Sequence, residues 1–320
     1  MSTQKTEEYR TAEEFTWMNR VEGLRYIIAP ENMDRPYPFL TPLEVVPGVV
    51  VPASIGYQAL SINHDPTMPG RFFMSHYYGP VVKIIKIRAT EDGGVELHED
   101  GVIAWAKTQW GTDCRGGFPE NSPGSDSKRM HGILRHPEIP TDLLVWRNGE
   151  TQGFFHLSSY TTSDGMVKWR LVGFFNLDGE NAPNHYIEAA NFMGDVLYVL
   201  RSKQDGTPAW LEAYNLDGSR RDSIPDDLLP PKTPFLYGIG VRNGKLYYIT
   251  SVWKSVTVPR GIYRGSELVV PDVCGDGIAF HNCDVDGDGD AYVTQYNDGR
   301  GHQATPAYLI RVPAKAFQTP

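Results

Sequence analysis

The chain has 320 residues, of which 40% are hydrophobic and 22% are charged, and its formal net charge is -9 with a pI near 5.5. This acidic balance argues against nucleic acid or an anionic membrane as a partner, because phosphate groups bind clustered Lys and Arg. The sequence has no stretch of about 20 apolar residues that could cross a membrane and no signal-peptide core in its polar N-terminus, so we expect a cytoplasmic protein.

A turn glycine precedes a short aromatic or β-branched run five times along the chain. The glycines are Gly70, Gly149, Gly194, Gly244 and Gly289. From Gly149 onward they recur about every 45 to 50 residues, which is typical of four-stranded propeller blades. The runs 169–179 and 210–218 both end in Asn-Leu-Asp-Gly and predict outer strands. We therefore predict an all-β fold, a five-bladed β-propeller.

Two segments flank or interrupt this repeat. We expect residues 1–35 to be an N-terminal extension and residues 36–320 to be the propeller domain. The run 42–52 (PLEVVPGVVVP) predicts a strand that closes the ring by joining the last blade, as propellers commonly do. Residues 105–130 are rich in Gly, Ser, Pro and Asp and hold Trp105 and Trp110. They predict an inserted loop, either a lid or a disordered tether.

Polar and ionisable residues recur in the segments before the hairpins, which would be the inner strands lining the central channel. They are His64 and Asp65, His136, His185, Tyr186 and Glu188, and His281. A purely structural ring would more often place Val, Ala or Gly there. We therefore expect a single active site in the channel, built from residues that lie far apart in the sequence.

Three of these segments resemble motifs of the five-bladed glycosidases of the arabinanase and xylosidase type. His64-Asp65-Pro66 resembles their first-blade motif, and Glu188-Ala189-Ala190 resembles their Glu-Ala-Pro strand. Phe280-His281-Asn282 resembles their Gly-His-Asn segment, whose His faces a channel cation. The resemblance implies that Asp65 is the general base, Glu188 the general acid and His281 a cation ligand. His136 stands where that family has the Asp that orients the acid, and would orient or tune the pair.

The same residues suggest acid/base chemistry on physical grounds. Inverting glycoside hydrolysis requires one protonated and one ionised carboxyl group with a water between them, a role that Asp65 and Glu188 could fill. Both carboxylates could instead only satisfy backbone groups of the inner strands. A carbohydrate-like substrate would be bound by nearby polar and aromatic side chains, because aromatic rings stack on sugars. The candidate substrate-binding residues are His64, His185, Tyr186 and Trp110.

The sharpest local motif is Asp284-Val-Asp286-Gly-Asp288-Gly-Asp290. Alternating carboxylates on a Gly-broken turn converge hard oxygen ligands on one point, which suits Ca²⁺. The motif resembles the Asp-rich calcium loops of integrin-type propeller repeats. We expect a structural Ca²⁺ at Asp284, Asp286, Asp288 and Asp290, with a solvated acidic turn as the alternative.

Two rival functions remain open. His64, His136, His185 and His281 all precede predicted hairpins, and imidazoles from several blades could hold a transition metal. The protein would then be a metal-dependent lyase, isomerase, cyclase or oxygenase acting on a small natural product or terpenoid. A non-catalytic sugar-binding propeller is the other rival. The differences among the five segments favour one asymmetric site over a repeated sugar site.

Overall fold

The structure is a computed structural model, and the residues that it describes cover the strands and some of their connections. The described residues are 50–56, 61–65, 71–75, 81–89, 95–104, 130–139, 142–147, 153–161, 163, 167–177, 185–203, 207–234, 236–250, 258–259, 261–271, 278–285, 291–297, 307–312 and 314–317. Within them the regular structure is β-strand, apart from two short 3-10 helices, η3 (Asp226–Leu228) and η4 (Ala314–Phe317). The predicted all-β class is confirmed.

The described strands pair into five antiparallel sheets. The first contains β2 (Ile62–His64), β3 (Arg71–Ser75), β4 (Val81–Ala89) and β5 (Val95–Ala104). The second contains β6 (Met130–Arg135), β7 (Leu143–Arg147), β8 (Gly153–Thr161) and β9 (Val167–Asn176). The third contains β10 (Tyr186–Met193), β11 (Val196–Ser202) and β12 (Trp210–Tyr214).

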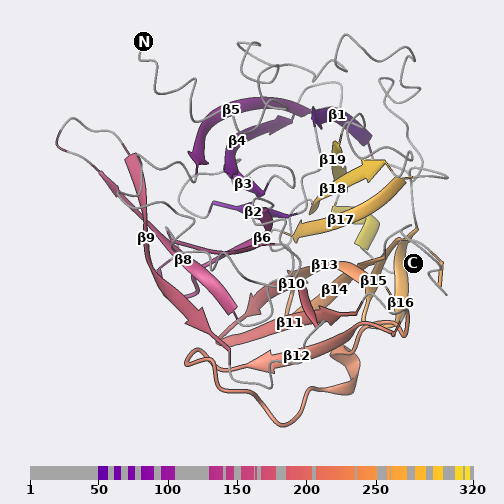
Figure 1. Cartoon of the computed structure of the whole chain (residues 1–320). Coiled ribbons are helices and arrows are strands. Elements are labelled where there is room, and N and C mark those ends of the chain that lie inside the picture. Colours follow the sequence, from indigo (N-terminus) through magenta and orange to yellow (C-terminus); the bar gives the residue numbers. More distant parts are fainter. Residues whose placement is uncertain are drawn as a thin grey trace.

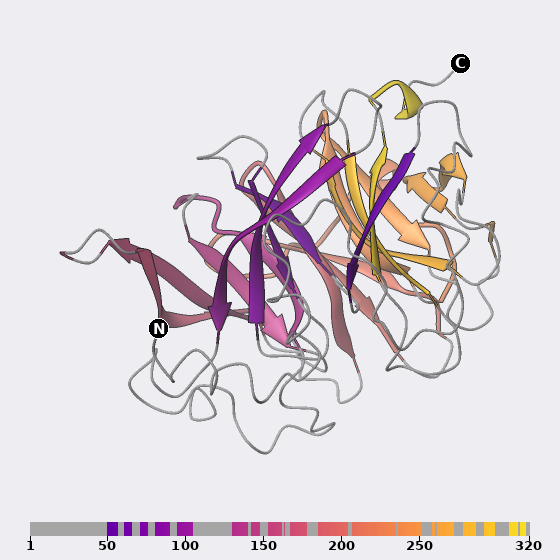
Figure 2. The same ribbon diagram turned by 90° about the horizontal axis from the view of Figure 1, so that it is seen from above.

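The last two sheets are formed by the C-terminal third of the chain, with β1 from the N-terminal part added to the fifth. The fourth contains β13 (Leu236–Arg242), β14 (Lys245–Thr250), β15 (Gly261–Arg264) and β16 (Glu267–Pro271). The fifth contains β17 (Ile278–Val285), β18 (Ala291–Asn297), β19 (Ala307–Val312) and β1 (Val50–Gly56). β1 pairs antiparallel with β19, and the two strands lie side by side in Figure 2.

We call β2, β6, β10, β13 and β17 the inner strands, because they lie toward the middle of the molecule and contact one another. β2 contacts β6, β6 contacts β10, β10 contacts β13, β13 contacts β17, and β17 contacts β2. The last strands, such as β5, β9, β12 and β16, lie at the periphery (Figure 1). Antiparallel sheets that radiate from a middle in this way form a propeller-type fold.

Each predicted turn glycine falls between an inner strand and the strand that follows it, with the exception of Gly149. Gly194 and Gly244 adopt φ values of 63° and 67° in the turns after β10 and β13, the conformation for which glycine was expected. Gly149, however, falls between β7 and β8, so it marks the second hairpin of its sheet and not the first. The first hairpin is closed by a side chain, because the backbone N–H groups of Glu138 and Ile139 both donate to His136 Nδ1 at 3.2 Å.

The core between the second and third sheets holds the start of β10 in place. Trp146 is fully buried, packs edge-on against Phe154 at 5.3 Å, and donates from Nε1 to the carbonyl of Ile187 at 3.0 Å. A Cβ on Gly132 would come within 1.9 Å of the Trp146 ring. Glycine at this position therefore lets the indole lie over β6 and reach β10.

Several sequence expectations fall outside the described residues. These are the extension 1–35, the first part of the predicted strand 42–52, and the inserted loop 105–130 with Trp110, apart from Met130 at the start of β6. The predicted N-terminal strand corresponds to β1, which begins at Val50 in the described part. Among the described residues, no helix has the length and apolarity needed to span a membrane.

Candidate functional site

Glu188 on β10 has the environment best suited to chemistry. Its side chain is 10% exposed, and His131 Nε2 on β6 lies 3.1 Å from its Oε2 atom. The hydroxyl of Ser202, at the end of β11, donates to its other carboxylate oxygen. His131 Nε2 also lies 3.1 Å from the backbone carbonyl of Glu188. Because a carbonyl oxygen only accepts, this ring nitrogen carries a proton and donates.

Two β-bulges bring Glu188 and His131 together. The register of β10 shifts between Ile187 and Ala189, which leaves Glu188 without an opposite residue on β11. The register of β6 shifts in the same way between Met130 and Gly132, at His131. Bulges are common next to active sites, where they re-aim a side chain.

The contacts of Glu188 limit what it can do. Ser202 and His131 bond to different oxygens of the carboxylate, so this is not a Ser-His pair that could activate a nucleophile. An imidazole and a hydroxyl contact the two carboxylate oxygens, and none of the described Lys or Arg side chains is paired with Glu188. An oriented carboxyl group is the kind of side chain that general acid/base catalysis uses.

Asp65 and Glu188 lie near opposite ends of the inner strands. It follows β2 at the hairpin, is buried, and has Arg71 Nη1 3.3 Å from its Oδ2 atom. The Ser61 hydroxyl lies 3.1 Å from both the backbone N and O of Ile133, which fixes the level of β2 against β6. Asp65 follows Ser61 in the sequence, whereas His131, which contacts Glu188, precedes Ile133. About six residues of strand, or on the order of 20 Å, therefore separate the levels of the two carboxylates. The structure does not bring the expected acid/base pair together.

His136 is also at the hairpin end and does not reach Glu188. Its ring stacks on that of His156 at 4.7 Å, and His156 Nε2 is 2.8 Å from the buried Asp142 Oδ2. Burial lowers the pKa of His136, and the charge of His156 lowers it further. His131, five positions earlier in the sequence, holds the contact that was expected of His136.

The other candidate substrate and metal residues do not gather around one point in the described part of the chain. The His64 ring meets Phe72 at 5.2 Å, and the His185 ring meets Trp210, on the last strand of its sheet, at 4.8 Å. Tyr186 begins β10, opposite Ser202. Among the described residues, no group of three or more His, Cys, Asp or Glu is placed to hold a metal.

Two of the predicted metal ligands lie on β17. Asp284 is opposite Tyr292 near the end of this strand, and His281 falls at a register shift between Phe280 and Asn282. The calcium motif thus begins in β17 and continues through the hairpin before β18. The remaining ligands, Asp286, Asp288 and Asp290, lie outside the described residues.

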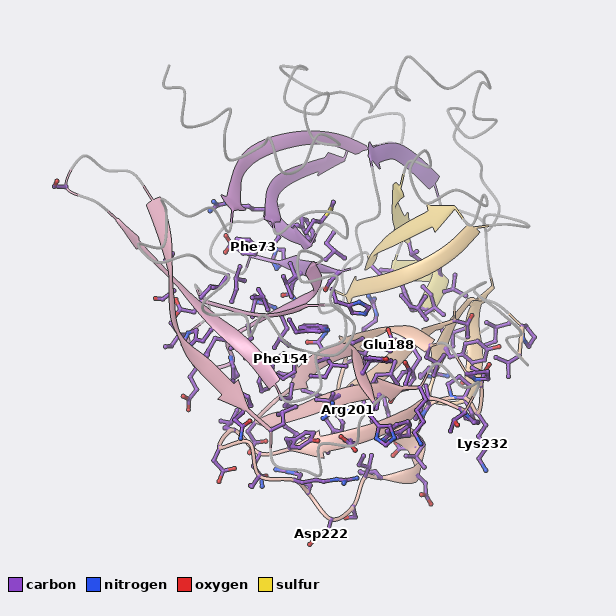
Figure 3. The ribbon with its side chains drawn as sticks, viewed as in Figure 1. Phe73, Phe154, Glu188, Arg201, Asp222 and Lys232 are labelled. Atoms are coloured by element: carbon purple, nitrogen blue, oxygen red, sulfur yellow. The ribbon has the colours of Figure 1, made fainter. Side chains whose placement is uncertain are left out.

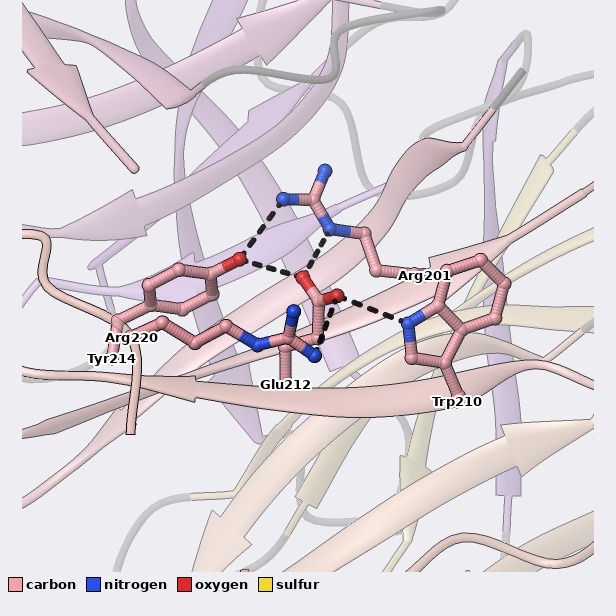
Figure 4. A network of polar contacts seen from close by, with 5 residues as sticks. All are labelled: Arg201, Trp210, Glu212, Tyr214 and Arg220. Atoms are coloured by element: carbon pink, nitrogen blue, oxygen red, sulfur yellow. Dashed lines mark hydrogen bonds and ion pairs between the residues drawn. The ribbon is translucent and has the colours of Figure 1, made fainter. Parts of the chain in front are cut away.

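A second largely buried glutamate occupies the same sheet as Glu188. Glu212 on β12 accepts hydrogen bonds from Arg201 Nε at 2.8 Å and from the Tyr214 hydroxyl at 2.6 Å, both on Oε2. Its Oε1 atom accepts from Trp210 Nε1 at 3.1 Å and pairs with Arg220 at 3.4 Å (Figure 4). Burial alone would raise the pKa of Glu212, but the Arg201 charge and these hydrogen bonds lower it. This glutamate is held ionised and joins β11 to β12.

His131 was not among the sequence candidates, although the sequence carries a signal for it. Met130-His131-Gly132 has the same order as Ile187-Glu188-Ala189, with a large apolar residue, an ionisable residue and a small residue. Aligning the segments on this triplet instead of on the turn glycine would have placed His131 beside Glu188.

No protein-family model matches this sequence, and no curated protein sequence matches it. Among solved structures the chain is similar to AztD from Citrobacter koseri, with 13% identity over 74% of this chain and 58% of that one and a TM-score of 0.32. For a glucose dehydrogenase the identity is 12% over 80% and 96%, with a TM-score of 0.41. For sucrose-6-phosphate hydrolase from Lactobacillus gasseri it is 12% over 81% and 59%, also with a TM-score of 0.41. None of these likenesses assigns the chain to a family.

Proposed function

We propose that the chain is a five-bladed β-propeller whose ring is closed by the pairing of β1 with β19. The five sheets and the succession of contacts from β2 through β17 and back to β2 support this proposal. Completing the last blade with an N-terminal strand joins the two ends of the chain in one sheet and leaves no gap in the ring. A central channel would then run between the inner strands.

We propose further that the protein is an enzyme of glycoside-hydrolase type, with Glu188 as the general acid that protonates the leaving oxygen. The observation that carries this proposal is the Glu188 carboxyl group, which is 10% exposed, oriented by His131 and Ser202, and without a described Lys or Arg partner. General acid catalysis needs a carboxyl group that is held in a fixed orientation beside the leaving oxygen. Asp65 is not part of this proposal, because it lies at the hairpin end.

The experiment measures hydrolysis of paired glycosides by the wild-type protein and the Glu188→Gln variant. Xylosides and arabinofuranosides are the first choice, following the resemblance to arabinanases and xylosidases. The leaving oxygen of a methyl glycoside needs a proton, whereas dinitrophenolate leaves a dinitrophenyl glycoside without one. Loss of the acid should therefore slow methyl glycoside hydrolysis by about 10² to 10⁴ and affect the dinitrophenyl glycoside far less.

Glu212→Gln is the matched control, because Glu212 is equally buried in the same sheet. A structural defect would slow both glycosides by the same factor, and only Glu188→Gln should separate them. Equal effects on both substrates, or a wild-type protein that hydrolyses neither sugar class, would remove the proposal.

A His-ligated metal enzyme is the second candidate. The bulges of β6, β10 and β17 hold His131, Glu188 and His281, and two imidazoles with one carboxylate are a familiar ligand set for non-haem iron. Elemental analysis of the purified protein tests it. Stoichiometric iron, zinc or manganese that is lost in a His131→Ala, His281→Ala double variant would favour this candidate over the glycosidase.

We also propose a structural Ca²⁺ in the hairpin between β17 and β18. The support is the alternation of Asp284, Asp286, Asp288 and Asp290 across a turn between paired strands. Added Ca²⁺ should raise the melting temperature and EGTA should lower it, with no response in an Asp286→Asn, Asp288→Asn variant. Identical melting curves for the wild-type protein with Ca²⁺ and with EGTA would contradict this site.

A further inference from the structure

A histidine side chain holds the turn between β6 and β7. His136 Nδ1 accepts hydrogen bonds from the backbone N–H groups of Glu138 and Ile139, each at 3.2 Å. Asn, Asp, Ser and Thr commonly hold turns in this way, through side-chain oxygens that accept from backbone N–H groups a few residues later. An imidazole differs from these groups, because its charge changes between about pH 5 and 8.

The hydrogen bonds of His136 decide which ring nitrogen can take up a proton. A nitrogen that accepts from two N–H groups carries no hydrogen, so the neutral ring has its hydrogen on Nε2. A second proton can bind only at Nδ1, the atom that holds the turn. Protonated Nδ1 is a donor and can no longer accept. The charged ring and the two turn hydrogen bonds therefore exclude each other.

A second histidine opposes the charged form of His136. The His156 ring on β8 stacks on the His136 ring, with centroids 4.7 Å apart and 23° between the ring planes. His156 Nε2 lies 2.8 Å from Oδ2 of Asp142, a buried residue just before β7, and this contact keeps the second ring in place. Two stacked imidazoles cannot both be charged without repulsion.

The charged groups around His136 come from three elements. Among the described residues, His156 on β8, Asp142 before β7 and Glu138 in the turn act on it. Burial lowers the pKa of His136 and the His156 charge lowers it further, whereas the two carboxylates raise it. On the neighbouring first sheet, Asp65 and Arg71 are paired with each other at 3.3 Å.

We propose that His136 is a pH-operated cap: the neutral ring closes the turn between β6 and β7, and a proton taken from solvent at Nδ1 releases it. Release stays local, because the His136 backbone N–H still donates to the Asp142 carbonyl at 2.9 Å. It also exposes little apolar surface, since Ile139 is already 43% exposed. The cap involves neither Glu188 nor His131, so the inference does not depend on the proposed function.

The direction of the pH dependence follows from the lowered pKa. The stability that the cap contributes is complete above the ordinary value of 6.5 and is lost as pH falls through the folded-state pKa of His136. The turn should therefore be closed at neutral pH and released in mild acid.

The first test follows the His136 ring and the turn amides by NMR from about pH 8 to about pH 5. The ring should carry its hydrogen on Nε2 at high pH and titrate with a midpoint below 6.5. The Glu138 and Ile139 amides should lose hydrogen-exchange protection about threefold to tenfold with the same midpoint, the effect of losing one hydrogen bond each. A ring hydrogen on Nδ1 at high pH, or amide protection that does not follow the ring, would overturn the cap.

Two variants separate the cap from other effects of acid. Asn accepts from turn N–H groups and does not titrate, so His136→Asn should keep both amides protected across the whole range. His136→Ala has no acceptor and should leave both amides at every pH as unprotected as the wild-type amides are in acid. A pH dependence that survives in His136→Asn, or an alanine variant that keeps its protection, would contradict the proposal.

The turn after β12 is the internal control. The Ser219 backbone N–H donates to Asp217 Oδ1 at 2.9 Å, so a side chain holds this amide too. Hydrogen bonds from Ser219 lower the pKa of Asp217 below its ordinary value of 3.8, which keeps this acceptor charged throughout the titration. Figure 3 places the nearby Asp222 at the outer edge of the molecule. Ser219 should keep constant protection, and a loss with the same midpoint as at Glu138 would indicate a global acid transition and overturn the cap.

Discussion

Two glutamates in one sheet, Glu188 and Glu212, are almost equally buried and have opposite surroundings. Their side chains are 10% and 11% exposed. Glu188 is on the inner strand β10 and accepts from an imidazole and a hydroxyl, whereas Glu212 is on the last strand β12 and accepts from Arg201, Tyr214 and Trp210 with Arg220 nearby.

The difference between the two carboxylates lies in their partners and not in their burial. Arginine never deprotonates at working pH, so Glu212 is kept ionised and serves as a fixed link between two strands. The partners of Glu188 are an imidazole and a hydroxyl, neither of which carries the permanent charge of an arginine. The two glutamates also differ in position, because the inner strands meet in the middle of the molecule and β12 lies at its rim.

Amide substitutions of Glu188 and Glu212 should have the largest effects, and these effects should differ most between the two residues. Glu188→Gln should lower methyl glycoside turnover by about 10² to 10⁴ while the free energy of unfolding changes by about 1 kcal/mol or less, because an amide can accept from His131 and donate to Ser202. Glu212→Gln should instead lower the free energy of unfolding and leave the ratio of the two glycoside rates unchanged. Its amide N–H₂ would face Arg201 Nε on one side, or Trp210 Nε1 and Arg220 on the other, and these groups only donate, at a cost of about 3 kcal/mol. Urea unfolding and kinetics on both variants test this, and a stability loss in Glu188→Gln as large as in Glu212→Gln would contradict it.

Removal of the main cation from the Glu212 network should have the next largest effect. In Arg201→Met the Glu212 carboxylate stays buried without its closest charge partner, which typically costs about 3 to 5 kcal/mol. Urea unfolding measures the loss. The double variant Arg201→Met, Glu212→Leu is the control and should recover part of it, because the unpaired charge is then gone. No recovery would mean that packing of the Arg201 stem, and not its charge, stabilises β11 and β12.

Acid should weaken the Glu212 link through its lowered pKa. A folded-state pKa below the ordinary value of 4.5 means that the contribution of Glu212 to stability is complete above that value and is lost as pH falls through the folded pKa. The stability difference between the wild-type protein and Glu212→Gln should therefore shrink as pH falls from about 5 to about 3. Unfolding curves at successive pH values measure it, and a constant difference would argue against an ionised Glu212.

The smallest expected effect is at Ser202. Ser202→Ala removes one neutral hydrogen bond to Glu188 and should cost about 1 kcal/mol of stability and up to about tenfold in turnover. Thr at this position retains the hydroxyl and should restore most of the activity, which separates orientation of Glu188 from general packing. An alanine variant with unchanged kinetics would assign Ser202 to structure alone.

The sequence by itself determined the elements whose signals are local. Turn glycines and aromatic runs identified the hairpins after β10 and β13, and the two Asn-Leu-Asp-Gly segments correctly indicated outer strands, now β9 and β12. The polar character of the inner strands was also visible, including Glu188 on β10. These features depend on neighbours in the chain, so residue type and spacing reveal them.

Tertiary structure alone decided which polar residues meet. The hairpin after β6 is closed by His136 and not by a glycine, so glycine spacing set the second sheet out of phase and directed attention to His136 instead of His131. Asp65 and Glu188 both lie next to or within inner strands, but at opposite ends, because one follows its strand and the other is near the start. Contacts across sheets depend on register and bulges, and these are set by packing between strands, as with Trp146 over Gly132, which no single stretch of sequence displays.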